Sequence, residues 1–278
     1  MKNLEITTLV ENSKGEHLSL ENEHGISFLI EVDDKKILFD TGQTDSFIKN
    51  SFLLNKNITT LDHVVLSHGH YDHSGGFREL VKVNNDFKLW IGEGFFKLKY
   101  GFQNGAYEYL GNDFDQQFLK NHNINTSYIN QDITEIEKDV FIVTNFDKTQ
   151  KDEIINPRFV IKENNEFYKD AFLDEVLIAI KTSKGIIAIL GCSHPGMRNM
   201  LETVKKRLNA PLYAVLGGTH LVEADKTCLD NSLEYLNSGN IEYVGVSHCT
   251  GFNAMEKMKK SNSNYFHNRT GTSLIINN

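Results

Sequence analysis

The stretch that decides the fold reads Ser67-His68-Gly69-His70-Tyr71-Asp72-His73-Ser74-Gly75-Gly76. It follows Val64-Val65-Leu66, an apolar run that suits a buried strand. Four metal-type side chains within six residues are more than one ion binds comfortably, so the stretch indicates two adjacent ions. The spacing also differs from the helical HExxH arrangement, because the first two histidines are separated by a single glycine and follow a strand.

Four other apolar runs also end at a side chain that can bind a metal. The run at 36–39 is followed by Asp40, and runs in the second half of the chain are followed by His194, His220 and His248. In sheets that alternate with helices, functional sites gather beyond the carboxyl ends of the strands. We therefore expect these side chains and the histidine-rich stretch to converge on one site.

The remaining histidines and the cysteines lack such a context. Cys192 and Cys249 stand close to two of these histidines and are interpreted as small packing residues, with soft ligands or redox-sensitive neighbours as the alternative. Five histidines are expected to be surface or structural residues: His17, His24, His63, His122 and His267. Three cysteines without CxxC spacing suit a reducing compartment better than a disulfide framework.

The order of apolar runs and turn residues predicts the secondary structure. In the first half, strands are expected at 4–10, 26–32, 36–39, 64–66 and 88–91, and helices at 45–54 and 77–81. In the second half, strands are expected at 176–182, 186–190, 212–216 and 241–246, and helices at 197–208, 227–236 and 254–260. Residues 94–174 have weaker periodicity and predict an insertion or lid with a few strands, such as 140–144, within a single domain spanning 1–278. Strands that alternate with helices predict the α/β (α+β) class.

The composition excludes several classes of protein. A chain of 278 residues that is 40% hydrophobic can bury a substantial core, which argues against a disordered or fibrous protein. The formal net charge of −8 disfavours nonspecific binding to nucleic acid or to an anionic membrane. The sequence has no apolar run near the roughly 20 residues that span a bilayer, and its first residues do not look like a secretion signal. We therefore expect a cytoplasmic protein.

The histidine-rich stretch resembles the HxHxDH signature of the metallo-β-lactamase superfamily. With Asp40-Thr41-Gly42 upstream and His194 and His248 downstream, the resemblance spans most of the chain. It implies a four-layer αββα sandwich with two divalent metal ions, zinc in the first place and iron or manganese otherwise. It also implies two sets of metal ligands: His68, His70 and His194 for one ion, and Asp72, His73 and His248 for the other. Asp40 would orient a histidine through a hydrogen bond.

The sequence departs from the common pattern of that superfamily at one position. His220 stands where a bridging aspartate is expected, and Asp225 lies too far along to replace it. The segments 191–196, 217–221 and 248–251 resemble instead a narrower branch that includes the dihydropterin ribofuranosylaminobenzene phosphate synthases. We interpret His220 and Asp72 as catalytic residues.

The resemblance implies an enzyme that acts on a small phosphorylated or heteroaromatic metabolite. Metal-activated hydrolysis is the main expectation, and transfer with release of pyrophosphate, as in the narrower branch, is the alternative. A diiron redox protein and a noncatalytic sensor are further alternatives. The side chains expected to contact the substrate are Phe95, Phe96, Lys97, Lys99, Tyr100, Tyr107 and Phe252. The expected partner is a small molecule, not nucleic acid or a membrane, and a homodimer is left open.

Overall fold

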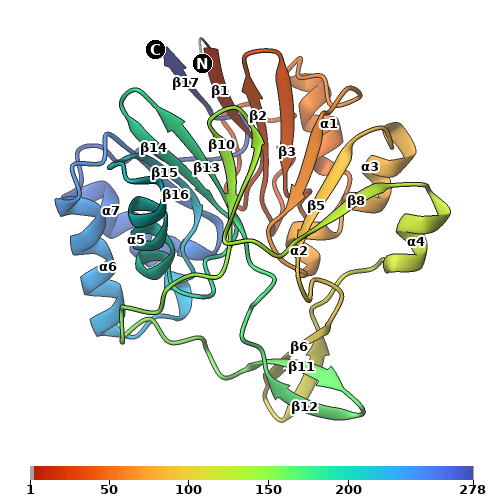
Figure 1. The fold of residues 1–278 in the computed structure, drawn as a ribbon. Helices are drawn as coiled ribbons and strands as arrows, with labels where there is room; N and C mark the ends of the chain where they lie inside the picture. Colours follow the sequence, from red (N-terminus) through yellow and green to blue (C-terminus); the bar gives the residue numbers. More distant parts are fainter. Residues whose placement is uncertain (1–2, 278) are drawn as a thin grey trace. The chain divides into compact units, whose positions relative to one another are not determined.

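The computed structural model describes residues 3–277, whose elements are labelled in Figure 1. They form two compact units. Unit 1 runs from the N-terminal strand to Asn130 and also contains Asn156–Asp174 and Arg269–Asn277, whereas unit 2 contains Gln131–Ile155 and Glu175–Asn268. The segment 94–174, expected as an insertion or lid, therefore contributes to both units. Within the described range, the helices are too short or too polar to cross a lipid bilayer.

Unit 1 is built on a seven-stranded mixed sheet. Its strands are β1 (Asn3–Val10), β2 (Ser27–Val32), β3 (Lys35–Phe39), β4 (His63–Leu66), β5 (Lys88–Gly92), β8 (Asn125–Ile129) and β17 (Ser273–Asn277). Their order across the sheet is β17-β1-β2-β3-β4-β5-β8. Neighbours from β17 to β3 are antiparallel, and neighbours from β3 to β8 are parallel. The carboxyl ends of β3 and β4 therefore meet at one edge.

The longer helices of unit 1 pack on one face of this sheet. The helices are α1 (Ser46–Leu53), α2 (Tyr71–Ser74), α3 (Phe77–Val83) and α4 (Gln116–Asn121). Phe47 of α1 and Phe77 of α3 share an apolar core with alternate strand residues such as Val64 and Leu66. Strand side chains alternate between the two faces of a sheet. This packing therefore fixes which face each residue of β4 occupies, and so how the histidine-rich stretch leaves the strand.

A four-stranded antiparallel sheet completes unit 1. Its strands, in the order β12-β11-β6-β7, are β12 (Glu166–Lys169), β11 (Phe159–Glu163), β6 (Leu98–Gln103) and β7 (Ala106–Tyr109). The turn Asn104-Gly105 between β6 and β7 has left-handed φ angles at both residues, which asparagine and glycine tolerate. All four residues of β7 are exposed, so this strand buries neither of its faces.

Unit 2 is a six-stranded sheet whose helices lie on one face (Figure 1). The strands, in spatial order, are β16 (Tyr243–Ser247), β15 (Leu212–Gly218), β14 (Gly185–Leu190), β13 (Leu177–Thr182), β10 (Val140–Val143) and β9 (Ile133–Glu137). The helices are α5 (Met197–Leu208), α6 (Lys226–Ser238) and α7 (Phe252–Ser261), with short 3-10 turns η1 (Leu221–Glu223) and η2 (His248–Thr250). Alternate strand residues such as Ala188 and Leu190 pack against Met200 and Val204 of α5.

The helix predicted at 197–208 is confirmed as α5, with the same bounds. Three basic residues in its last turn, Lys205, Lys206 and Arg207, complement the negative end of the helix dipole. Asn209 then takes a left-handed conformation that ends the helix. The predicted α/β class is confirmed by the two helix-covered sheets.

Candidate metal centre

The histidine-rich stretch forms the connection from β4 to α2 in unit 1. β4 ends at Leu66 and α2 begins at Tyr71, so His68 and His70 lie on the intervening loop. His68 Nε2 lies 3.0 Å from His70 Nδ1, and the ring centroids of His68 and His73 are 4.2 Å apart. All three imidazoles are buried. The structure therefore brings the three histidines of the stretch together.

Asp40 fixes the orientation of two of these rings through a hydrogen-bond network. It follows β3 and is fully buried. Its carboxylate accepts the Ser67 backbone N–H at 2.7 Å, the Ser67 hydroxyl at 2.7 Å and His73 Nδ1 at 2.6 Å. The Ser67 hydroxyl oxygen in turn accepts a hydrogen bond from His68 Nδ1 at 2.9 Å. Because each Nδ1 acts as a donor, each Nε2 carries the lone pair that a metal ion requires.

The donor set fits a divalent metal ion. Burial lowers the pKa of His68 well below its usual value, and the neighbouring His73 and His70 lower it further. The ring is therefore neutral near pH 7, as metal binding requires. Two imidazole nitrogens at about 2.0–2.1 Å from one tetrahedral zinc lie about 3.3 Å apart. The 3.0 Å separation of His68 and His70 is close to that value.

Asp72 presents its carboxylate to two histidines. Its Oδ2 lies 3.7 Å from His73 Nε2 and 3.2 Å from His24 Nε2. His24 was expected to be a surface or structural residue, and its side chain is indeed 54% exposed, yet it contacts a predicted ligand. His24 does not follow an apolar run, so the pattern of strand ends could not identify it.

The loop that carries His68 and His70 is held by residues that sequence reasoning missed. Asp174 Oδ2 accepts the Gly69 N–H at 2.8 Å. Asn112 donates to the carbonyl of Phe95 at 2.9 Å, and that carbonyl would lie 2.2 Å from a Cβ on Gly69. The close approach of these two backbones therefore requires glycine at position 69.

In unit 2, the other predicted residues follow three neighbouring parallel strands. β14 pairs with β15 and β15 with β16, all in parallel. His194, His220 and His248 follow these strands in that order. The ring centroids of His194 and His220 are 4.3 Å apart. The structure therefore brings these two side chains together at one edge of the unit 2 sheet.

Glu175 holds the turn that carries His194. Its two carboxylate oxygens accept the backbone N–H groups of Ser193 at 2.5 Å and of His194 at 3.1 Å. Glu175 is buried and directly follows Asp174, which holds the Gly69 N–H in unit 1. Two consecutive acidic residues thus each fix one of the loops that carry predicted ligands.

His220 lies against the sulfur of Cys249. Its backbone N–H donates to Cys249 Sγ at 3.3 Å, and its Nε2 donates to Glu223 Oε2 at 3.1 Å. Burial alone would lower the pKa of His220, but the hydrogen bonds with Cys249 and Glu223 outweigh burial and raise the pKa to about 10. Burial alone would raise the pKa of Cys249, but hydrogen bonding with Cys192 and the charges of His248 and His220 hold it well below its usual value. The two groups therefore interact directly, and each shifts the pKa of the other toward its charged form.

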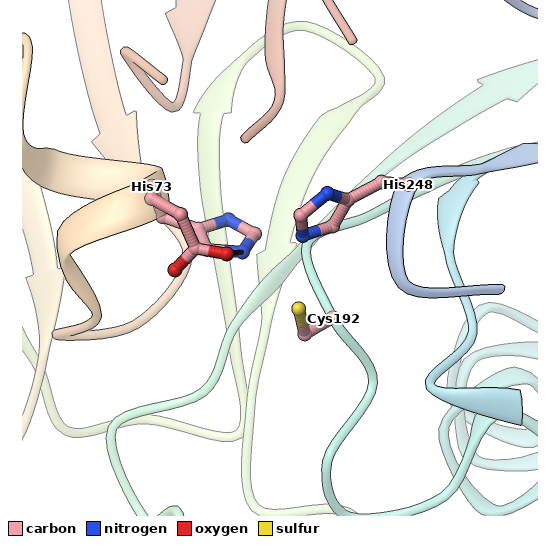
Figure 2. A group of neighbouring side chains, drawn as sticks. His73, Cys192 and His248 are labelled. Carbon is pink, nitrogen blue, oxygen red and sulfur yellow. Dashed lines mark ion pairs between the residues drawn. The ribbon is translucent and has the colours of Figure 1, made fainter. Parts of the chain in front are cut away.

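Cys192 and His248 also lie close together in unit 2. Figure 2 labels both side chains, along with His73 of unit 1. Cys192 Sγ lies within 4.8 Å of a ring nitrogen of His248, and the same sulfur lies within 4.8 Å of a ring nitrogen of His194. Unit 2 therefore places thiol and imidazole donors side by side.

Two of the residues predicted to contact the substrate are buried. Lys99 is 1% exposed, and its ammonium contacts the carboxylates of Asp170 at 2.6 Å and Asp174 at 2.9 Å. Phe95 is also 1% exposed, and its ring packs edge-on against Phe96. Both side chains belong to the supporting structure of unit 1.

The other predicted contacts are more accessible. Lys97 is partly exposed, 3.0 Å from Glu163. Tyr107 stacks on Phe167 with ring centroids 3.7 Å apart, and Tyr100 packs edge-on against the same ring at 5.4 Å. In unit 2, Phe252 is 77% exposed at the start of α7.

Comparisons with known sequences agree with this arrangement. The family model of the metallo-beta-lactamase superfamily matches residues 23–163. The chain is 30% identical, over 284 aligned residues, to a 7,8-dihydropterin-6-methyl-4-(beta-D-ribofuranosyl)-aminobenzene-5'-phosphate synthase of Methanocaldococcus jannaschii, covering 93% of this chain and 92% of that protein. It is 32% identical to an uncharacterized protein of the same organism, covering 87% and 89% of the two chains.

A comparison with solved structures agrees as well. Tm1679, described as a metal-dependent hydrolase of the beta-lactamase superfamily, matches with a TM-score of 0.84 and 28% sequence identity. The match covers 99% of this chain and 100% of that one. The fold predicted from the sequence is therefore confirmed.

Proposed function

The chain belongs to the metallo-β-lactamase superfamily, and on that premise we propose that it is a metal-dependent enzyme acting on a small phosphorylated or heteroaromatic metabolite. One observation carries the proposal: the buried loop of unit 1 holds His68 Nε2 and His70 Nδ1 3.0 Å apart. Imidazoles at this spacing repel one another when protonated and are stabilised when they share a cation.

We propose two divalent ions, zinc in the first place, and six ligands. By the family pattern, the ligands are His68, His70 and His194 for one ion, and Asp72, His73 and His248 for the other. The proposal is supported by family membership and by the convergence of donors within each unit. Imidazole and carboxylate donors suit iron and manganese as well.

Each residue at the centre then has a distinct task. Bound ions of this kind lower the pKa of a water molecule and polarise a phosphoryl or carbonyl oxygen. Asp40 holds His73 by its Nδ1, so that Nε2 is the metal-binding atom. Asp72 accepts a proton from the attacking group. His220, as an imidazolium, stabilises negative charge on an oxygen of the substrate.

We propose hydrolysis as the reaction, because water is the nucleophile that such a centre activates, and the similar Tm1679 is described as a hydrolase. A second candidate is group transfer, favoured by the 30% identity to the Methanocaldococcus jannaschii synthase over most of both chains. In that reaction the aminobenzene compound attacks the methylene carbon of a pterin-methyl diphosphate. A bond forms between the amine nitrogen and this carbon as the carbon–oxygen bond breaks, and pyrophosphate leaves. Asp72 takes up the proton that the amine nitrogen releases.

For either reaction we propose that accessible side chains hold the substrate. Lys97 would pair with a phosphate group, and four aromatic residues would pack against a flat ring: Phe96, Tyr100, Tyr107 and Phe252. Phe95 and Lys99 are assigned to support of the site, because their side chains are buried.

An assay with and without a nucleophile tests the proposal and separates the two reactions. Metal-loaded protein is offered a pterin-methyl diphosphate alone and then with an aminobenzene ribose phosphate, and the products are identified by mass spectrometry. Hydrolysis gives either the pterin-methyl phosphate with phosphate or the pterin alcohol with pyrophosphate, and it does so in both cases. Transfer gives the coupled product and pyrophosphate only in the second case. Phosphoesters, lactones and thioesters extend the panel, with metal-free protein as the control. Complete absence of turnover at full metal content would contradict the enzyme proposal.

Substituting alanine for His220 is expected to lower activity by about 100-fold, as loss of one charge-stabilising group does. Bound metal should be partly retained, because the six ligands proposed for the two ions are unchanged. Steady-state rates and metal analysis on the same preparation measure both effects. His267→Ala, an exposed histidine of the same unit, is the matched control. Full retention of metal and activity in His220→Ala would exclude His220 from the site.

A further inference from the structure

We infer that Cys192, His220 and Cys249 form a second kind of metal site, for a thiophilic ion, within unit 2. Each residue offers one ligand atom, and the three atoms lie within 4.8 Å of one another. Both cysteines are buried. The site shares His220 with the centre proposed above, and the sulfur of Cys192 also lies within 4.8 Å of ring nitrogens of His194 and His248. The inference does not rest on the proposed reaction, because its test requires no turnover.

The topology of unit 2 places these three residues side by side. β14, β15 and β16 are adjacent parallel strands, so their carboxyl ends lie at the same edge of the sheet. The strands end at 190, 218 and 247, and Cys192, His220 and Cys249 each stand two residues further along. Neighbouring strands are about 4.8 Å apart. Cys192 and Cys249 follow the outer two strands, on either side of the strand before His220, and their side chains come together so that the three ligand atoms lie within 4.8 Å of one another.

Existing contacts already order the three side chains. Cys249 Sγ accepts the His220 backbone N–H at 3.3 Å and lies 3.5 Å from the carbonyl oxygen of Cys192. A Cβ on Gly218 would lie 2.6 Å from the same sulfur, so glycine at this position makes room for it. The Cys249 sulfur thus bridges the loops that carry the other two ligands.

Glu223 selects the nitrogen of His220 that binds the ion. The Nε2–H of His220 donates to Glu223 Oε2 at 3.1 Å, which leaves Nδ1 as the ligand atom. Histidine ligands commonly donate their other ring N–H to a carboxylate, which orients the ring and raises its basicity.

The size and chemistry of the donor set suit a soft or borderline ion. In a tetrahedral zinc site, sulfurs at about 2.3 Å from the metal lie about 3.8 Å apart, so ligand atoms already within 4.8 Å need to move by only about 1 Å. Two thiolates and an imidazole favour Zn²⁺, Co²⁺ or Cu⁺ over Mg²⁺, Ca²⁺ or Mn²⁺. Three protein ligands leave the fourth position open to water or a small anion. Binding displaces the remaining thiol and imidazolium protons to solvent.

Cobalt spectroscopy tests the inference. Co²⁺ is titrated into the reduced, metal-free full chain, and the thiolate-to-cobalt charge-transfer band in the near ultraviolet is followed. Histidine and carboxylate ligands do not give this band. We expect it in the wild type, and we expect its loss in both Cys192→Ser and Cys249→Ser. Cys228→Ser is the matched control, because Cys228 is also buried in unit 2 but lies in α6, near Arg198.

Each contrary outcome overturns the site. A wild type without the band lacks thiolate ligation, and a band that survives Cys249→Ser does not come from these three residues. If only Cys192→Ser abolishes the band, the sulfur of Cys192 binds cobalt without Cys249, and therefore in another set of ligands. If a variant fails to fold by circular dichroism, X-ray absorption on the zinc-loaded wild type decides: a zinc–sulfur shell at about 2.3 Å supports the site, and a purely nitrogen and oxygen shell overturns it. Failure of the proposed enzyme activity would leave the band unchanged, so the two failures are distinguishable.

Discussion

Replacing His70 with alanine is expected to lower bound metal by about one ion per chain and activity by roughly 100-fold or more. His70 lies 3.0 Å from His68 in the buried loop of unit 1, and its loss removes one of the nitrogens proposed to bind an ion. A catalytic ion contributes several kcal/mol to stabilising the transition state, and each 1.36 kcal/mol corresponds to a tenfold change in rate. Plasma mass spectrometry and kcat/KM on one preparation measure the two effects.

The same variant is expected to lose the part of its stability that depends on metal. An ion that binds only the folded chain stabilises it by about 2.7 kcal/mol when the free ion stands at 100 times its Kd. The wild type should therefore unfold at a higher temperature with metal than with a chelator. In His70→Ala this difference should shrink, while the two proteins should be similar in chelator.

An exposed histidine of the same unit provides the control for His70→Ala. His122 caps the end of α4, and its Nδ1 contacts the carbonyl of Phe118 at 2.9 Å. His122→Ala should keep the metal content, the activity and the metal-dependent rise in Tm. Unchanged metal stoichiometry in His70→Ala would refute its assignment as a ligand.

The sequence predicts the residues of the candidate centre because they stand at the ends of buried strands. β4 and β14 are buried along their full length, so their apolar runs stop abruptly where His68 and His194 follow. A polar side chain directly after such a run is predicted to lie at the carboxyl end of a strand, where functional sites gather. Within unit 2, β14, β15 and β16 pair in parallel, so the residues that follow them lie at one edge of the sheet.

The sequence does not predict the residues that hold these loops. Asp174 accepts the N–H of Gly69, which is 105 residues away along the chain, and a carboxylate that serves a distant backbone N–H leaves no periodic signature. Lys99 shows the converse error. Lys99 was expected to contact the substrate, but its side chain is buried, and its ammonium contacts two carboxylates from the segment after β12. Only long-range pairing distinguishes these two environments.

Lys99→Met is expected to destabilise the chain by about 3–5 kcal/mol, the cost of breaking a buried ion pair by removing one partner. The ammonium of Lys99 contacts Asp170 and Asp174, and all three side chains are no more than 6% exposed. Methionine has a similar volume but leaves two carboxylates buried without their cation. Urea unfolding followed by circular dichroism measures the loss. Because Asp174 also accepts the Gly69 N–H, the variant should bind metal more weakly as well.

A control variant separates the loss of stability caused by unpaired buried carboxylates from a general effect of removing a lysine. Lys97 forms an exposed pair with Glu163 in the same segment, so Lys97→Met should change the unfolding free energy by less than about 1 kcal/mol. Adding Asp170→Asn to Lys99→Met should recover part of the loss, because one buried charge is removed. The deficit of Lys99→Met should also shrink as pH falls: an unpaired buried carboxylate has a raised pKa in the folded chain, so the folded chain binds more protons than the unfolded one and gains stability from acid. A loss equal to that of Lys97→Met, or one that does not change with pH, would mean that the Lys99 ammonium does not neutralise these two carboxylates.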